Sequence, residues 1–186
     1  MPDLSQTASW VWVVLVAGVL LLSLGGYFLG RYLGYVTTRR HLVGLIGRRE
    51  NLLASKRTLE AVMRHLADES DELLIEFAAN PESEDRRALV ETASRMRMLT
   101  DDLDVIPLPK ALVPLGDALA DAAFVLAEES GRVQAVLDAD AVLTALGTVD
   151  LARVEGEYDR AARLLDEMCD DYGVEDAAVY GGGLYI

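Results

Sequence analysis

Acidic side chains near the carboxyl end of the chain are of the types that bind metal ions. Six carboxylates lie within eleven residues: Asp166, Glu167, Asp170, Asp171, Glu175 and Asp176. Residues four apart share a helix face, so pairs such as Asp166 and Asp170 present oxygens that suit a hard divalent cation. The Asp-x-Asp-x-Asp-Gly loop that would make this pattern specific is absent. We interpret the cluster as a solvated face, with a cation site or docking of a basic partner as the functional alternatives.

The remaining chemistry-bearing residues form no enzyme motif. His41 and His65 each lack a second histidine or a cysteine at ligand spacing, and no Glu-x-x-His pair occurs. The sequence has no Gly-x-Ser-x-Gly nucleophile motif and no phosphate-cradling glycine loop before a helix. We therefore expect no enzyme activity, no cofactor and no bound metal. A metal-dependent membrane enzyme that uses the acidic cluster is the least favoured hypothesis.

One long apolar run dominates the amino-terminal part of the chain. No charge occurs between Leu4 and Gly30, and about 20 apolar residues in a helix cross about 30 Å of hydrocarbon. Residues 1–9 carry no Lys or Arg, and no small-residue cleavage site follows the run, so it does not resemble a cleaved signal peptide. We predict a short extracytoplasmic tail over residues 1–8 and a transmembrane helix over residues 9–33.

The charges that flank this run predict its orientation. Asp3 is the one charged side chain before it, whereas five arginines follow it: Arg31, Arg39, Arg40, Arg48 and Arg49. Arginine-rich flanks stay in the cytoplasm. Arginine outnumbers lysine fifteen to two, a bias typical of a GC-rich bacterial genome, and the lone Cys169 suits a reducing compartment. The prediction is a bacterial inner (plasma) membrane protein with its N-terminus outside and its C-terminal domain in the cytoplasm.

The same five arginines have a second candidate role. They alternate with apolar residues over a basic juxtamembrane segment, residues 34–50 with Arg31 just before it. An arginine near an anionic membrane surface contributes about 1 kcal/mol to binding. We predict contact of all five with anionic lipid; the alternative is a stop-transfer flank that only fixes orientation.

Charge is divided unevenly between the two parts of the chain. Residues 1–49 carry a net charge of +4 and residues 50–186 a net charge of −18. Nucleic-acid binding needs a basic footprint, and an acidic domain is repelled by phosphate. We expect no nucleic-acid partner, and the acidity itself promotes solubility.

Three glycines form a candidate packing face in the apolar helix. Gly26, Gly30 and Gly34 are spaced by four, so they share one face of a helix. Small residues at this spacing allow two membrane helices to approach closely. We predict packing into a homo-oligomer or against another membrane protein; the alternative is ordinary glycine usage.

The rest of the sequence predicts an all-α fold. Apolar residues recur every three or four positions, which indicates helices over residues 38–79, 81–104, 115–146 and 149–172. One alternative for the first of these is that it continues the transmembrane helix, with Gly34, Gly44 and Gly47 as weak points. The turns between helices are predicted at Asn80-Pro81-Glu82, at a proline-rich elbow over residues 105–114, and at Gly147-Thr148, with Gly173 closing the last helix. Two hairpins joined by the elbow predict an antiparallel four-helix bundle over residues 51–173. Extended coiled-coil hairpins are the alternative.

The carboxyl-terminal tail, residues 174–186, combines three glycines with an apolar end. Leu184, Tyr185 and Ile186 resemble C-terminal peptides that protein grooves capture by their last side chain and carboxylate. The alternative is that the tail packs on its own bundle.

These features together favour an interaction protein. The preferred hypothesis is a single-pass membrane scaffold that recruits a protein partner through its acidic bundle or its tail. The alternative is a regulatory or signalling subunit of a larger membrane complex.

Overall fold

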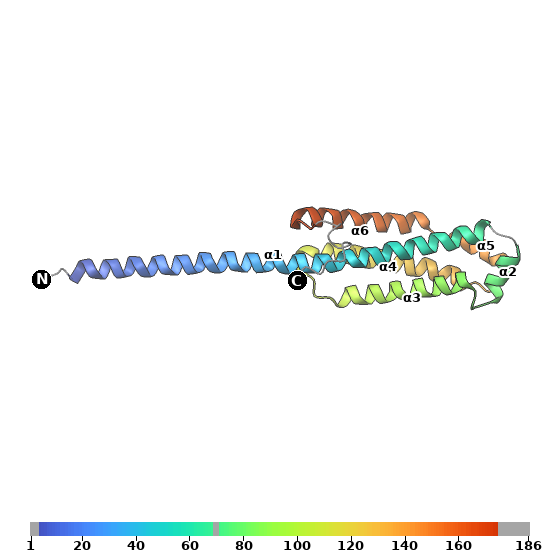
Figure 1. Ribbon diagram of the computed structural model, residues 1–186, viewed down its shortest axis with the longest axis horizontal. Coiled ribbons are helices and arrows are strands. Elements are labelled where there is room, and N and C mark those ends of the chain that lie inside the picture. The colour runs from blue at the N-terminus through green and yellow to red at the C-terminus, as the bar shows by residue number, and fades with distance from the viewer. Residues whose placement is uncertain (1–3, 69–70, 175–186) are drawn as a thin grey trace.

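The computed structural model describes residues 4–68 and 71–174, with side chains over residues 15–67 and 72–174. The described residues form helices and no strands, which confirms the all-α fold (Figure 1). The elements are α1 (Leu4–Asp68), α2 (Asp71–Ala79), α3 (Glu84–Val105), the short 3₁₀ helix η1 (Lys110–Leu112), α4 (Val113–Gln134), α5 (Ala139–Thr148) and α6 (Leu151–Tyr172).

Helix α1 is an unbroken rod of 65 residues. At 1.5 Å per residue it is about 100 Å long. Its first half projects alone, and its second half packs among the other helices (Figure 1). The predicted weak points Gly34, Gly44 and Gly47 do not interrupt it. A single helical glycine costs only about 1 kcal/mol relative to alanine, which a helix of this length tolerates.

The bundle consists of four long helices, and α4 contacts the other three, α1, α3 and α6. Helix α4 packs chiefly against α3 and α6 and also contacts α1. Successive long helices run in opposite directions, while α2 and α5 contact each other at the end remote from the projecting rod (Figure 1). The apolar residues that recur every three or four positions in the predicted second helix are buried in α3: Leu89, Ala93, Met96, Leu99 and Leu103. The predicted bundle is therefore present, but the single helix predicted over residues 38–79 is wrong, because α1 ends at Asp68 and α2 begins at Asp71.

The predicted third helix, residues 115–146, is wrong because it ignores a break. Helix α4 ends at Gln134 and α5 begins at Ala139. Asp138 causes the new start, since its carboxylate accepts a hydrogen bond from the Asp140 amide at 3.3 Å. Val142 is consequently buried, whereas Leu143, predicted to face inward, is 52% exposed.

The predicted turn at Gly147-Thr148 is also misplaced. Both residues belong to α5, and the carboxylate of Asp150 caps α6 by accepting from the Arg153 amide at 2.9 Å. Aspartate is as favourable a helix cap as threonine.

Gly173 and Asn80 both lie at helix boundaries, as predicted. Gly173 has φ 58° and ψ 40° and closes α6 in the left-handed conformation, as predicted. The Asn80 side chain accepts from the Glu82 amide at 2.9 Å, so it shapes the turn, although α3 begins two residues later at Glu84.

Candidate functional site at the junction of the apolar rod and the bundle

The projecting half of α1 is long and apolar enough to cross a membrane, and none of its most apolar window is buried in the protein. Exposed large apolar side chains follow one another from Leu15 to Val36. A patch of this size marks a surface that contacts lipid or another protein. The Ser23 hydroxyl within it donates to the Val19 carbonyl at 2.8 Å, so this polar group is satisfied inside the helix.

Burial in the bundle begins soon after this apolar surface. Thr38 is buried, and Leu42, Leu45 and Ile46 have at most 1% of their surface exposed. The stretch predicted as a basic juxtamembrane segment is thus part of α1, and from residue 38 it contributes to the bundle core. A helix that continues along the axis of the rod does not lie in a membrane plane, so the arginines, rather than the whole segment, remain the candidates for lipid contact.

A sequence signal for this packing was present and missed. Leu45, Leu52, Leu59 and Leu66 repeat every seven residues, and each is at most 1% exposed. A period of seven is the spacing by which one helix keeps a stripe against its neighbours. One further step of seven residues upstream from Leu52 reaches Leu45, so this repeat predicts that the bundle already includes residue 45.

The predicted glycine face lies on the projecting half of α1. Among the described residues, no atom lies within 4 Å of the position that a Cβ would take at Gly26, Gly30 or Gly34. The face is therefore accessible to a second helix, and its packing stays a prediction.

The end of α6 is fastened to α1 where the bundle begins. The Tyr35 hydroxyl donates to the Tyr172 carbonyl at 2.7 Å, and the two rings stack with centroids 5.5 Å apart. The Arg39 guanidinium donates to the Gly173 carbonyl at 3.4 Å. These donors satisfy carbonyls that a helix end leaves free, and a cation suits the negative end of the helix dipole. We call these contacts the Tyr35 clamp.

The clamp also places the root of the tail. Val174 is buried, and its amide donates to the Cys169 carbonyl at 2.9 Å. The partner-docking residues predicted in the tail, Leu184, Tyr185 and Ile186, lie outside the described residues. The end of α6, to which the tail is attached, nevertheless contacts α1 at Tyr35 and Arg39, where the apolar rod meets the bundle.

The five arginines of α1 separate into different surroundings. Arg31 is exposed on the apolar rod, and Arg39 belongs to the Tyr35 clamp. Arg49 lies 3.7 Å from a carboxylate oxygen of Glu50. Arg40 and Arg48 line one groove together.

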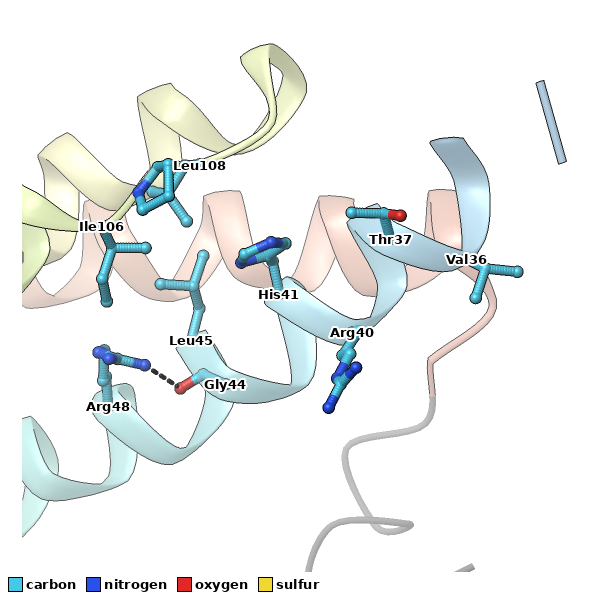
Figure 2. Close-up of a pocket in the computed structure, with 10 residues that line it drawn as sticks. Val36, Thr37, Arg40, His41, Gly44, Leu45, Arg48, Ile106 and Leu108 are labelled. Atoms are coloured by element: carbon cyan, nitrogen blue, oxygen red, sulfur yellow. Dashed lines mark hydrogen bonds between the residues drawn. The ribbon is translucent and has the colours of Figure 1, made fainter. Parts of the chain in front are cut away.

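This groove, of about 610 Å³, lies between α1 and the loop that follows α3. Arg40, His41 and Arg48 provide polar groups from α1, and Ile106 and Leu108 face them with apolar side chains (Figure 2). Arg48 donates to the Gly44 carbonyl at 3.1 Å, which folds its guanidinium back along the helix. We call this hollow the junction groove.

The proline-rich elbow holds the apolar wall of the groove. Pro107 and Pro109 keep residues 106–109 out of a regular helix, while Pro114 sits in the first turn of α4, where its missing amide hydrogen is harmless. A Cβ at Gly116 would collide with Leu108 Cδ1, so the absence of a side chain lets the elbow lie directly on α4.

The predicted acidic cluster is on the surface. Asp166, Glu167, Asp170 and Asp171 are all exposed on α6, and the remaining two members lie outside the described residues. Among the described residues, no group of three or more His, Cys, Asp or Glu side chains is placed to hold a metal ion. His65 contacts Asp85, with 2.7 Å between Nδ1 and Oδ2, a link between α1 and α3 that the sequence did not reveal.

No protein-family model, curated protein or solved structure matches the chain. The chain is an all-α protein in which one helix, long and apolar enough to cross a membrane, runs without interruption into a helical bundle.

Proposed function

We propose that the chain is a single-pass, membrane-anchored scaffold that presents an acidic helical bundle to protein partners. The observation that supports this most strongly is the continuity of α1. One half of the helix exposes a long apolar surface and the other half packs into the bundle core, with no break between them. A domain held in this way has a fixed position relative to its anchor, which suits a docking platform.

The proposed location is the bacterial inner membrane, with the N-terminus outside and the bundle in the cytoplasm. Support comes from the arginines that follow the apolar run and from the division of charge into +4 before residue 50 and −18 after it. A reporter fused after Ile186 is expected to be active in the cytoplasm. Activity confined to the periplasm would overturn the orientation.

The proposed partners are lipid, a second copy of the chain or another membrane protein, and a protein that binds the bundle or the tail. We propose neither an enzymatic reaction nor a cofactor, and the acidic bundle disfavours nucleic acid. Proteins captured with the full chain are to be compared with those captured by a chain that lacks residues 181–186. Loss of a partner on truncation would assign docking to the tail, whereas recovery of the monomer alone would contradict the scaffold.

Self-association is expected to depend on the glycine face. Gly30→Ile places a branched side chain on this face. It is expected to abolish chemical crosslinking of two copies in membranes by a reagent that does not react with cysteine. Gly25→Ile is the matched control, because Gly25 also lies in the apolar rod with no described atom near its Cβ position, but points about 100° away from Gly26. Equal crosslinking in both variants would remove this face as the contact.

The second candidate function is a regulatory subunit, and the Tyr35 clamp is the observation that favours it. The clamp ties the end of α6 to α1 immediately beyond the apolar rod. A shift of the rod would therefore act on α6 directly as well as through α1. Co-purification with a transporter or a sensor would favour this function over a passive scaffold.

A further inference from the structure

The geometry points to the junction groove as a binding site for the phosphate of an anionic phospholipid headgroup. This inference rests on the proposed membrane anchoring and deepens it by naming a ligand and a site. It differs from diffuse attraction of all five arginines to a charged surface, because it assigns binding to Arg40, His41 and Arg48 on one side of α1.

The groove has the chemistry that a headgroup requires. Two guanidinium groups offer several N–H donors that match the oxygens of a phosphate, and His41 adds another polar group beside them. The facing wall of Ile106 and Leu108 is apolar, so the polar groups of the groove lie on its α1 side (Figure 2). Its volume of about 610 Å³ is that of an ordinary small-molecule site.

Gly44 keeps the groove open between the two arginines. A Cβ there would lie 3.4 Å from Arg48 Nη1, so any larger side chain would fill the space in which the guanidinium lies. The hydrogen bond from Arg48 to the Gly44 carbonyl brings its guanidinium about one helical turn nearer to Arg40. Arg40 lies one helical turn before Gly44, and Arg48 lies one turn after it, so both arginines belong to the same stretch of α1 (Figure 2).

The membrane-proximal end of the groove, at Arg40, matches the depth of lipid phosphates. Arg40 lies seven residues after the predicted end of the transmembrane helix at Leu33, which is about 10 Å along the axis. The headgroup layer extends about 5–8 Å beyond the hydrocarbon on each side. An arginine side chain extends back toward the membrane by several ångströms, because helical side chains tilt toward the N-terminus and long cationic side chains snorkel. Arg40 thus reaches the phosphate level.

The test measures lipid retention by the full chain in detergent micelles. Native mass spectrometry counts bound phosphatidylglycerol and, as the neutral comparison, phosphatidylcholine. Wild type is expected to retain phosphatidylglycerol preferentially. The double variant Arg40→Gln with Arg48→Gln is expected to weaken this retention about tenfold or more, since two charge-assisted contacts are lost.

Two further variants separate a built site from net charge. Arg39→Gln removes the same charge one residue away, but Arg39 belongs to the Tyr35 clamp, so retention is expected to stay close to wild type. Gly44→Phe keeps every charge and fills the groove, so retention is expected to fall. Helix content and thermal unfolding of each variant verify the fold.

Several results would overturn the inference. Equal weakening by Arg39→Gln and Arg40→Gln would indicate diffuse attraction, and unchanged retention in Gly44→Phe would exclude the groove. Displacement of the lipid by inorganic phosphate at equal concentration would indicate a site for soluble phosphate. Membrane association of the chain is measured separately. If the protein stays in the membrane but its lipid retention does not depend on the groove residues, only this inference is contradicted. If the chain leaves the membrane, the proposed function is contradicted.

Discussion

At the scale of single residues, Arg86 is the clearest example of a buried cation with a structural task. It is 8% exposed and donates to the carbonyls of Phe77 and Ala78 at 3.2 and 3.0 Å, which closes the end of α2 from α3. Arg86→Met leaves both carbonyls without this donor and is expected to lower the free energy of unfolding by about 2–3 kcal/mol. Chemical denaturation of the full chain in detergent measures the change.

The neighbouring residue supplies the control for this prediction. Arg87 is exposed on the same helix, so Arg87→Met is expected to change stability by no more than about 0.5 kcal/mol. Equal effects of the two substitutions on the free energy of unfolding would show that the hydrogen bonds of Arg86 to the Phe77 and Ala78 carbonyls do not stabilise the protein.

A second residue-scale prediction concerns Glu129, whose carboxylate is 1% exposed. Arg132 Nη1 lies 3.2 Å from its Oε2, within ion-pair distance but without the alignment of a hydrogen bond. Arg132→Ala leaves the buried charge without this partner and is expected to lower the free energy of unfolding by about 2–4 kcal/mol. Urea denaturation tests this, and the double variant with Glu129→Leu is expected to recover most of the loss.

The exposed pair between Arg153 and Glu128 is the comparison for this second case. These groups lie 3.2 Å apart with 46% and 40% of their side chains exposed. Solvent screens such pairs, so Arg153→Ala is expected to cost less than about 1 kcal/mol. If Arg153→Ala lowered the free energy of unfolding as much as Arg132→Ala, burial of the Glu129 carboxylate would not explain the larger effect expected there.

At the scale of whole elements, α6 contains a glycine that its surroundings do not require. Gly156 is exposed, and no described atom lies within 4 Å of its Cβ position. Gly156→Ala is expected to raise the free energy of unfolding by about 0.5–1 kcal/mol, because alanine loses less backbone entropy in a helix. Gly116→Ala in α4 is the control that is expected to show no such gain, since the new methyl meets Leu108.

The Tyr35 clamp gives a prediction for the end of α6. Tyr35→Phe keeps the stacked ring and removes the hydrogen bond to the Tyr172 carbonyl, which is expected to cost about 1 kcal/mol locally. Hydrogen exchange of the amides over residues 169–174 should become faster, while the core of α4 should be unaffected. Tyr32→Phe, an exposed site on the apolar rod, is expected to leave this exchange unchanged.

Elements with a long apolar period were predictable from the sequence, whereas their exact ends were not. The existence and the buried face of α3 were predicted correctly, because Leu89, Met96 and Leu103 form a regular stripe, although the helix begins three residues after the predicted start at residue 81. The break after α4 and the exact start of α6 were missed because their caps, Asp138 and Asp150, are aspartates in a chain rich in aspartate. One Asp among many carries little local signal until its hydrogen bond is seen.

The junction groove shows a second limit of prediction. Arg40 and Arg48 were singled out by charge, but their partners Ile106 and Leu108 come from the elbow some 60 residues later. Only the packing of the elbow on Gly116 places these side chains opposite α1. Pairing of distant segments depends on tertiary structure, and no local pattern contains it.

At the scale of the whole molecule, the length of α1 would make the protein, if anchored as proposed, a rigid arm that pivots at the bilayer. The helix continues for 35 residues beyond Leu33, about 50 Å, before it ends beside α2. A membrane thinner than the apolar segment makes such a helix lean, and a lean of about 20° would sweep the distal tip sideways by about 18 Å. Bilayer thickness would thus set how far from its anchor the protein reaches.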